Sequence, residues 1–213
     1  NVATAAKHFP GHGDTATDSH TGLPLVDKSY EVLSKLELIP FHAAVDNGVD
    51  MLMTAHIQYP QIEKDTVKSI ADGSEVYVPA TLSDDIIKGV VREKMNFDGV
   101  VVTDAMNMDA IAKNFGEAQA VIMAIQADVD ICLMPTILRS KADVAKLDTI
   151  ISEVKNAINE GTITEDDLND SVRRILTLKE TRGILDYADD TRTWEEKLAN
   201  ANEQVGSKEN RDI

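Results

Sequence analysis

The sequence predicts an α/β protein in which helices cover a parallel sheet. Short apolar runs alternate with helical stretches about four times along the chain, which is typical of repeated strand–helix units. The clearest apolar run, residues 100–103, is β-branched throughout and has no polar alternation, as expected of a strand buried on both faces. Reactive side chains directly follow several of these runs, and enzymes with parallel barrels place their active sites at the carboxyl ends of the strands.

The order of the elements follows from the apolar runs and the residues that flank them. Strands are expected at residues 2–6, 50–54, 100–103 and 129–134. Helices are expected at residues 28–36, 39–45, 84–95, 109–113, 117–126, 141–159 and 164–182. The polar stretch at 58–78 is expected to be a long loop, and loops of that length in a compact domain are usually functional or mobile.

Both an open doubly wound sheet and a (β/α)8 barrel fit this order. Because a whole barrel takes about 250 residues, the roughly four βα units in residues 1–187 would form only its second half. The polar residues 188–213 are expected to be an extended tail or linker. The chain begins at Asn1, without a methionine and directly before a strand, so we expect it to be a piece of a longer protein.

The composition excludes several classes of protein. A formal net charge of −16 argues against non-specific nucleic-acid binding, because an anionic surface repels phosphate. The single cysteine, Cys132, excludes an internal disulfide. No apolar stretch approaches the roughly 18 residues that a membrane span needs.

Reactive groups are densest in residues 7–20, which hold three of the five histidines. In one parallel sheet, the carboxyl ends of the strands meet at a common edge, where a catalytic face is expected. The groups brought there are Lys7, His8, Asp18, His20, His56 and Asp104.

Two of these positions suggest specific chemistry. Asp104 follows four apolar strand residues; it is either a nucleophile or general base in a cleft, or a helix cap or buried hydrogen-bonded strut. In Asp18-x-His20 the acid can orient the imidazole and favour its protonated form, which suits proton transfer near neutral pH. The alternative for this pair is a solvated histidine beside a turn aspartate.

The remaining candidates are less specific. His8, His12 and His20 could form a metal site, but Pro10, Gly11 and Gly13 forbid the regular helix that would align the first two, so metal binding is disfavoured. His56 either lines the cleft or is a hydrogen-bonded core residue. Met108 either forms an apolar wall of the cleft or fills a gap in the core.

These residues carry a resemblance to a known family. Lys-His-Phe-Pro-Gly-His-Gly at 7–13, with Asp-Ser-His at 18–20, strongly resembles the signature of the β-N-acetylglucosaminidase (β-hexosaminidase) branch of glycoside hydrolase family 3. Phe-Asp-Gly-Val-Val-Val-Thr-Asp-Ala-Met-Asn-Met at 97–108 resembles the nucleophile segment of the same family. The segments at 53–56 and 80–83 match as well, and the similarity runs from residue 2 to about 187.

The resemblance implies a (β/α)8-type barrel and a retaining mechanism without metal or organic cofactor. Asp104 would be the nucleophile that forms a glycosyl-enzyme intermediate. His20, oriented by Asp18, would be the acid/base. Lys7, His8, His56 and Met108 would contact the sugar. The implied substrate is a terminal β-linked N-acetylglucosamine, typically from muropeptides during cell-wall (peptidoglycan) recycling in bacteria, either in the cytoplasm or outside it.

The sequence departs from the family at its beginning, and three alternative functions remain open. Strands that precede this segment in the family, and that carry further sugar-binding groups, are not in the sequence. We therefore expect the isolated chain to be inactive or weak and to associate with the first half of the barrel or with itself. The alternatives are a phosphorylase that uses phosphate instead of water, a catalytically inactive carbohydrate-binding fragment, and a β-glucosidase, which the Asp18-x-His20 pair disfavours.

Overall fold

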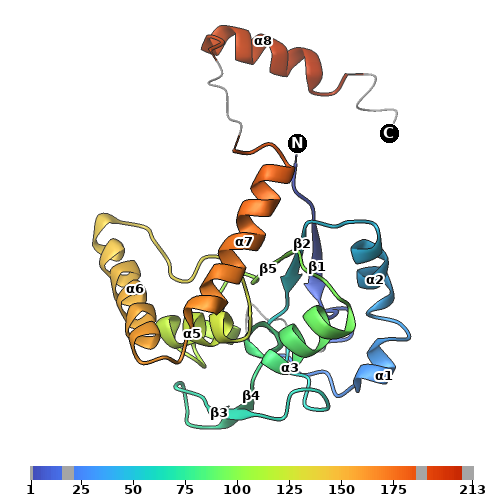
Figure 1. Cartoon of the computed structure of the whole chain (residues 1–213). Coiled ribbons are helices and arrows are strands. Elements are labelled where there is room, and N and C mark those ends of the chain that lie inside the picture. The colour runs from blue at the N-terminus through green and yellow to red at the C-terminus, as the bar shows by residue number, and fades with distance from the viewer. Residues whose placement is uncertain (1, 16–21, 186–190, 208–213) are drawn as a thin grey trace.

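The computed structural model describes residues 2–15, 22–185 and 191–207. Its central sheet has three parallel strands in the order β1 (Ala5–Phe9), β2 (Met51–Thr54) and β5 (Val100–Val102). A parallel bridge from Val102 to Ile131 continues the sheet past β5. Neighbouring strands therefore follow chain order, as successive units of a barrel do. The expected α/β class and partial barrel are confirmed (Figure 1).

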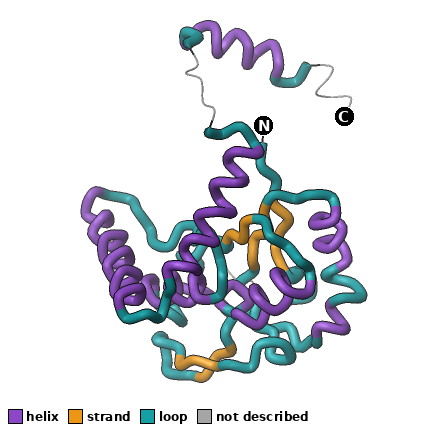
Figure 2. The backbone as a smooth tube through the Cα atoms, viewed as in Figure 1, coloured by secondary structure: helices purple, strands orange, loops and turns teal. Residues whose placement is uncertain are grey.

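Helices follow the strands and lie outside the sheet (Figures 1 and 2). The α-helices are α1 (Tyr30–Leu33), α2 (Ile39–Asp46), α3 (Asp84–Ile86), α4 (Asp109–Ala112), α5 (Glu117–Gln126), α6 (Val144–Asn159), α7 (Glu165–Thr181) and α8 (Trp194–Gln204). The described residues also form two short 3₁₀ helices, η1 (Ala80–Leu82) and η3 (Lys141–Asp143), and a π-helical segment, η2 (Ile87–Lys94).

Helix ends agree with the capping residues in the sequence. The Ser83 hydroxyl accepts from the Ile86 N–H at 3.1 Å and caps α3. Thr164 and Asp167 form a capping box at the start of α7. The expected helix at 28–36 is limited to α1, because the chain turns after it before α2 begins at Ile39.

Two strand predictions were wrong in extent. The first strand begins at Ala5 rather than at residue 2 and includes Lys7 and His8. The run at 129–134 forms one bridge instead of a strand. Hydrogen bonds to side chains replace some of the backbone hydrogen bonds that would pair this run with β5. The Leu133 N–H donates to Thr103 Oγ1 at 2.8 Å, and Asp130 Oδ2 accepts from the Val101 N–H at 2.7 Å.

The long loop expected at 58–78 contains an antiparallel hairpin, β3 (Thr66–Lys68) and β4 (Glu75–Tyr77). Each strand has three residues of mixed polarity, which is too short for a clear periodic signal. Gly73, at φ +75°, supplies the left-handed backbone needed in the connection. Because the hairpin follows β2, it belongs to the loops at the carboxyl ends of the strands.

The core lies between the sheet and its helices and is mainly aliphatic. From the strands come Phe9, Leu52 and Val101, and from the helices Leu33, Phe41, Ile86, Ile87, Val91, Ala120 and Ala124. Val100, Val101 and Val102 are all buried, which confirms that this strand is covered on both faces.

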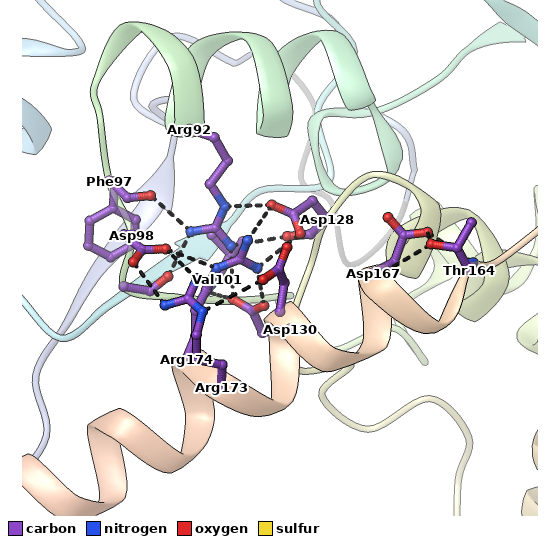
Figure 3. A network of polar contacts seen from close by, with 12 residues as sticks. Arg92, Phe97, Asp98, Val101, Asp128, Asp130, Thr164, Asp167, Arg173 and Arg174 are labelled. Atoms are coloured by element: carbon purple, nitrogen blue, oxygen red, sulfur yellow. Dashed lines mark hydrogen bonds and ion pairs between the residues drawn. The ribbon is translucent and has the colours of Figure 1, made fainter.

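A cluster of buried charged side chains connects α7 to the amino end of β5 (Figure 3). Arg92 and Arg174 converge on Asp128 and Asp130. The Asp130 side chain is fully buried, and it accepts from Arg174 Nη1 at 2.7 Å and from Arg92 Nη2 at 2.9 Å. Arg92 Nη1 also donates to the carbonyls of Phe97 and Gly99. These charges are paired and hydrogen-bonded, the condition under which charges can be buried.

The segment at 188–213 was expected to be extended, and this is wrong for the part that forms α8. Thr193 and Glu196 make a capping box at the start of that helix, a signal readable as Ser/Thr-x-x-Glu. Its role as a linker stays a prediction. Within the described ranges, no helix is both long and apolar enough to cross a membrane.

Candidate active site

The ends of β1 and β5 bring two sequence-predicted site residues together. His8 lies in β1, and Asp104 follows β5 by two residues. His8 Nε2 lies 3.5 Å from Asp104 Oδ2, and their side chains are 27% and 21% exposed. The pair is thus accessible from one side and supported by protein on the other. A carboxylate with this access can reach a bound molecule, which a buried strut cannot.

The backbone around Asp104 is fixed at successive peptide groups. The Asp104 N–H donates to the Thr54 carbonyl at 3.2 Å. Asp104 Oδ1 accepts from the Ala105 N–H at 2.8 Å. The Met106 N–H donates to the Leu133 carbonyl at 2.9 Å. One carboxylate oxygen is therefore oriented by the backbone, while the other, Oδ2, faces His8.

His56 lies behind this segment and is only 1% exposed. Its Nδ1 lies 2.8 Å from Thr81 Oγ1, and its Nε2 lies 3.0 Å from the Ala105 carbonyl oxygen. Burial lowers the pKa of His56, against the opposing effects of the Ala105 hydrogen bond and the Asp104 charge. The ring therefore has the surroundings of a hydrogen-bonded core residue, and its expected contact with substrate stays a prediction.

The other predicted site residues are placed as follows. Lys7 is exposed in β1. Met108 is 9% exposed and immediately precedes α4. Asp18 and His20 lie outside the described residues. Among the residues that are described, no group of three or more His, Cys, Asp or Glu could hold a metal ion.

The first part of the motif loop is anchored by residues that the sequence did not single out. The buried Tyr59 hydroxyl donates to the Gly11 carbonyl at 2.7 Å. Lys28 Nζ lies 2.6 Å from both Asp14 Oδ2 and Glu37 Oε1. Gly11 has φ +140°, and a Cβ there would lie 2.9 Å from Glu37 Cβ. These partners come from segments up to 48 residues away, so spacing gave no signal for them.

The family model of the glycosyl hydrolase family 3 N terminal domain matches residues 1–178. The chain belongs to glycoside hydrolase family 3. The match covers both the β1 end with Lys7 and His8 and the β5 end with Asp104.

Two named relatives are similar to most of this chain. It is 38% identical over 179 residues to "Beta-hexosaminidase A" of Pseudoalteromonas piscicida, covering 84% of this chain and 30% of that protein. It is 28% identical over 183 residues to "Beta-N-acetylglucosaminidase/beta-glucosidase" of Cellulomonas fimi, covering 86% of this chain and 30% of that protein.

Two solved structures of β-N-acetylglucosaminidases are similar to this chain. The family 3 β-N-acetylglucosaminidase from Paenibacillus sp. str. FPU-7 matches with a TM-score of 0.77 at 36% identity, over 91% of this chain and 34% of that one. The β-N-acetylglucosaminidase from Thermotoga maritima matches with a TM-score of 0.66 at 32% identity, over 83% of this chain and 34% of that one. The chain thus spans about a third of the length of these relatives.

Proposed function

We propose that this chain carries the catalytic residues of a retaining exo-β-N-acetylglucosaminidase. The observation that carries the proposal is the accessible Asp104 carboxylate at the carboxyl end of β5, 3.5 Å from His8 on β1. Family membership and relatives named as β-hexosaminidases support the substrate class. The proposed substrate is a terminal β-linked N-acetylglucosamine, with cell-wall muropeptides as one source.

In the first step, an Asp104 oxygen bonds to the anomeric carbon as the bond to the leaving-group oxygen breaks. Asp104 Oδ2 is the oxygen proposed to attack, because Oδ1 already accepts from the Ala105 N–H. The imidazolium of His20, oriented by Asp18, gives its proton to the departing oxygen. The products of this step are the free aglycone and a covalent glycosyl ester.

In the second step, neutral His20 removes a proton from water as the water oxygen bonds to the anomeric carbon. The ester bond to Asp104 breaks as the bond to water forms, and the carboxylate and the imidazolium are both restored. Two displacements at one carbon give net retention of configuration.

The remaining predicted site residues are proposed to hold the sugar. Lys7 and His8 lie in β1, which is separated in the sheet by β2 from β5, the strand that precedes Asp104. Both side chains can donate to hydroxyl groups. Met108 is proposed to supply an apolar contact, and His56 stays a candidate for binding. Holding the sugar near Asp104 accounts for a large part of the rate in such reactions.

The test uses the longest natural polypeptide that contains this sequence, because the relatives are about three times its length. Asp104→Asn should lower kcat on an aryl N-acetyl-β-glucosaminide by about 10,000-fold, as loss of a nucleophile does. Asp109→Asn is the matched control, because Asp109 is a nearby carboxylate that pairs with Lys113 at the surface. Normal turnover by Asp104→Asn would overturn the nucleophile assignment.

Two further measurements separate the alternatives. His20→Ala should slow substrates with poor leaving groups by about 100-fold or more, and activated aryl substrates less, because only the former need the acid. Product analysis in phosphate buffer should give free N-acetylglucosamine. The sugar 1-phosphate as main product would instead indicate a phosphorylase, and no turnover with retained binding of N-acetylglucosamine would indicate an inactive carbohydrate-binding protein.

A further inference from the structure

A chain of buried hydrogen bonds leads from the end of β2 to the residue after Asp104. The Thr54 hydroxyl donates to Thr81 Oγ1 at 2.9 Å. Thr81 Oγ1 lies 2.8 Å from His56 Nδ1 and 2.9 Å from the Ala55 carbonyl oxygen. His56 Nε2 lies 3.0 Å from the Ala105 carbonyl oxygen. Thr54, Thr81 and His56 are 0%, 0% and 1% exposed, so water does not compete for these groups.

The contacts on either side of His56 hold both nitrogens of its ring. A carbonyl oxygen only accepts, so Nε2 must carry the proton that is donated to Ala105. A neutral imidazole then has an unprotonated Nδ1, which needs a donor. The Thr81 hydroxyl, which accepts from Thr54, has one proton for two neighbouring acceptors, the Ala55 carbonyl and this Nδ1. Burial favours the neutral ring, since it disfavours the charged form.

Fixing Ala105 restricts the Asp104 carboxylate. The Ala105 N–H donates to Asp104 Oδ1, and the Ala105 carbonyl accepts from His56. Both polar groups of one residue are thus engaged, one with the carboxylate and one with the ring. A shift of the Ala105 backbone would rotate the carboxylate, and displacements of about 1 Å can cost roughly 100-fold in rate.

We propose that Thr81 is a positioning residue, whose hydroxyl holds the His56 ring and thereby holds Ala105 and the Asp104 carboxylate in their reactive orientation. This inference rests on the proposed function of Asp104 as nucleophile. Thr81 is too deeply buried to meet a sugar itself, and it acts through His56. A residue of this kind affects the chemical step rather than the binding of the sugar.

The test compares three variants of the longest natural polypeptide. Thr81→Val keeps the shape of the side chain and removes the hydroxyl, whereas Thr81→Ser keeps a hydroxyl. Ser83→Ala is the matched control. Ser83 lies two residues after Thr81, is 1% exposed and caps α3. Removing its hydroxyl therefore also destabilises the segment, but leaves the contacts of His56 intact. Each variant is assayed for kcat, KM and melting temperature.

The expected result separates positioning from stability. Thr81→Val should lower kcat about 10- to 100-fold with KM nearly unchanged, Thr81→Ser should restore most of the rate, and Ser83→Ala should keep kcat despite a lower melting temperature. Equal kcat values for Thr81→Val and Ser83→Ala would overturn the inference. So would a Thr81→Ser variant as slow as Thr81→Val.

A second measurement needs no activity. Nitrogen chemical shifts of His56 in the wild-type protein, assigned by their loss in His56→Gln, report which ring nitrogen is protonated. A neutral ring with the proton on Nε2 at neutral pH is expected, and a proton on Nδ1 would overturn the inference. If the wild-type enzyme cleaves no sugar, the proposed function fails, while the shifts still test the tautomer.

Discussion

Replacing Arg174 with methionine should destabilise the fold severely. Arg174 is 7% exposed, and its guanidinium contacts both Asp128 and Asp130. Methionine occupies a similar length but cannot pair with either carboxylate. Removing one partner of a buried ion pair costs about 3–5 kcal/mol, because the remaining charge stays buried. A domain with about 5–15 kcal/mol of total stability would lose a large part of it.

The neighbouring Arg173 provides the matched control on the same helix. Its side chain is 49% exposed, and its partner Asp98 is 69% exposed. Exposed ion pairs contribute about 0.2–1 kcal/mol, so Arg173→Met should unfold almost like the wild type. The two variants remove the same group from adjacent positions, and only burial and partners differ.

Urea unfolding of the chain, followed by far-ultraviolet circular dichroism, measures both variants against the wild type. The reasoning predicts a much lower midpoint for Arg174→Met with a similar slope, and little change for Arg173→Met. Equal midpoints for the two variants would refute it. Because the cluster lies at the amino end of β5, kcat per folded molecule of the longest natural polypeptide should be retained in Arg174→Met.

Two other substitutions test local features. Burial raises the pKa of Glu63 above its usual range, although hydrogen bonds from Ser83 and Asp65 oppose this. The folded chain therefore holds the Glu63 proton more tightly than the unfolded chain does, and the free energy of unfolding falls as pH rises through the folded-state pKa. Glu63→Gln should flatten the pH dependence of the urea midpoint. A pH dependence identical to that of the wild type would contradict this. Gly11→Ala should lower the free energy of unfolding by about 1–3 kcal/mol, because Gly11 has φ +140° and a Cβ there would clash with Glu37. Gly13→Ala is the control and should change this free energy little, because nothing lies within 4 Å of a Cβ at Gly13. Equal melting temperatures for the two variants would contradict the clash.

The sequence predicted those parts of the fold whose signals are local. Val100–Val102 is a uniformly β-branched run, and it is a strand buried on both faces. Glu117–Gln126 was predicted as a helix with the bounds that the structure has. The hairpin at Thr66–Tyr77 was missed because its strands are too short for a periodic pattern to emerge. The weak strand at 129–134 was overestimated, because Thr103 and Asp130 side chains replace ladder bonds there.

The candidate site also has one part that the sequence predicts and one part that it does not. The carboxyl ends of parallel strands share an edge, so the proximity of His8 and Asp104 follows from the order of the strands alone. The support behind Asp104 does not follow from that order. Thr81 reaches His56 from a turn 25 residues later in the chain, and no spacing rule connects them. Such contacts depend on how the loop at 55–83 folds back, which the sequence does not reveal locally.

The most direct test of the proposed mechanism is to trap the covalent intermediate. The reagent is a fluorinated N-acetylglucosaminyl fluoride, whose ester forms faster than it is hydrolysed, and the protein is the longest natural polypeptide that contains this sequence. After digestion, mass spectrometry should find one added sugar on Asp104 in the wild type and none in Asp104→Asn. A sugar on another residue, or turnover of the reagent with no labelled peptide, would contradict Asp104 as the nucleophile.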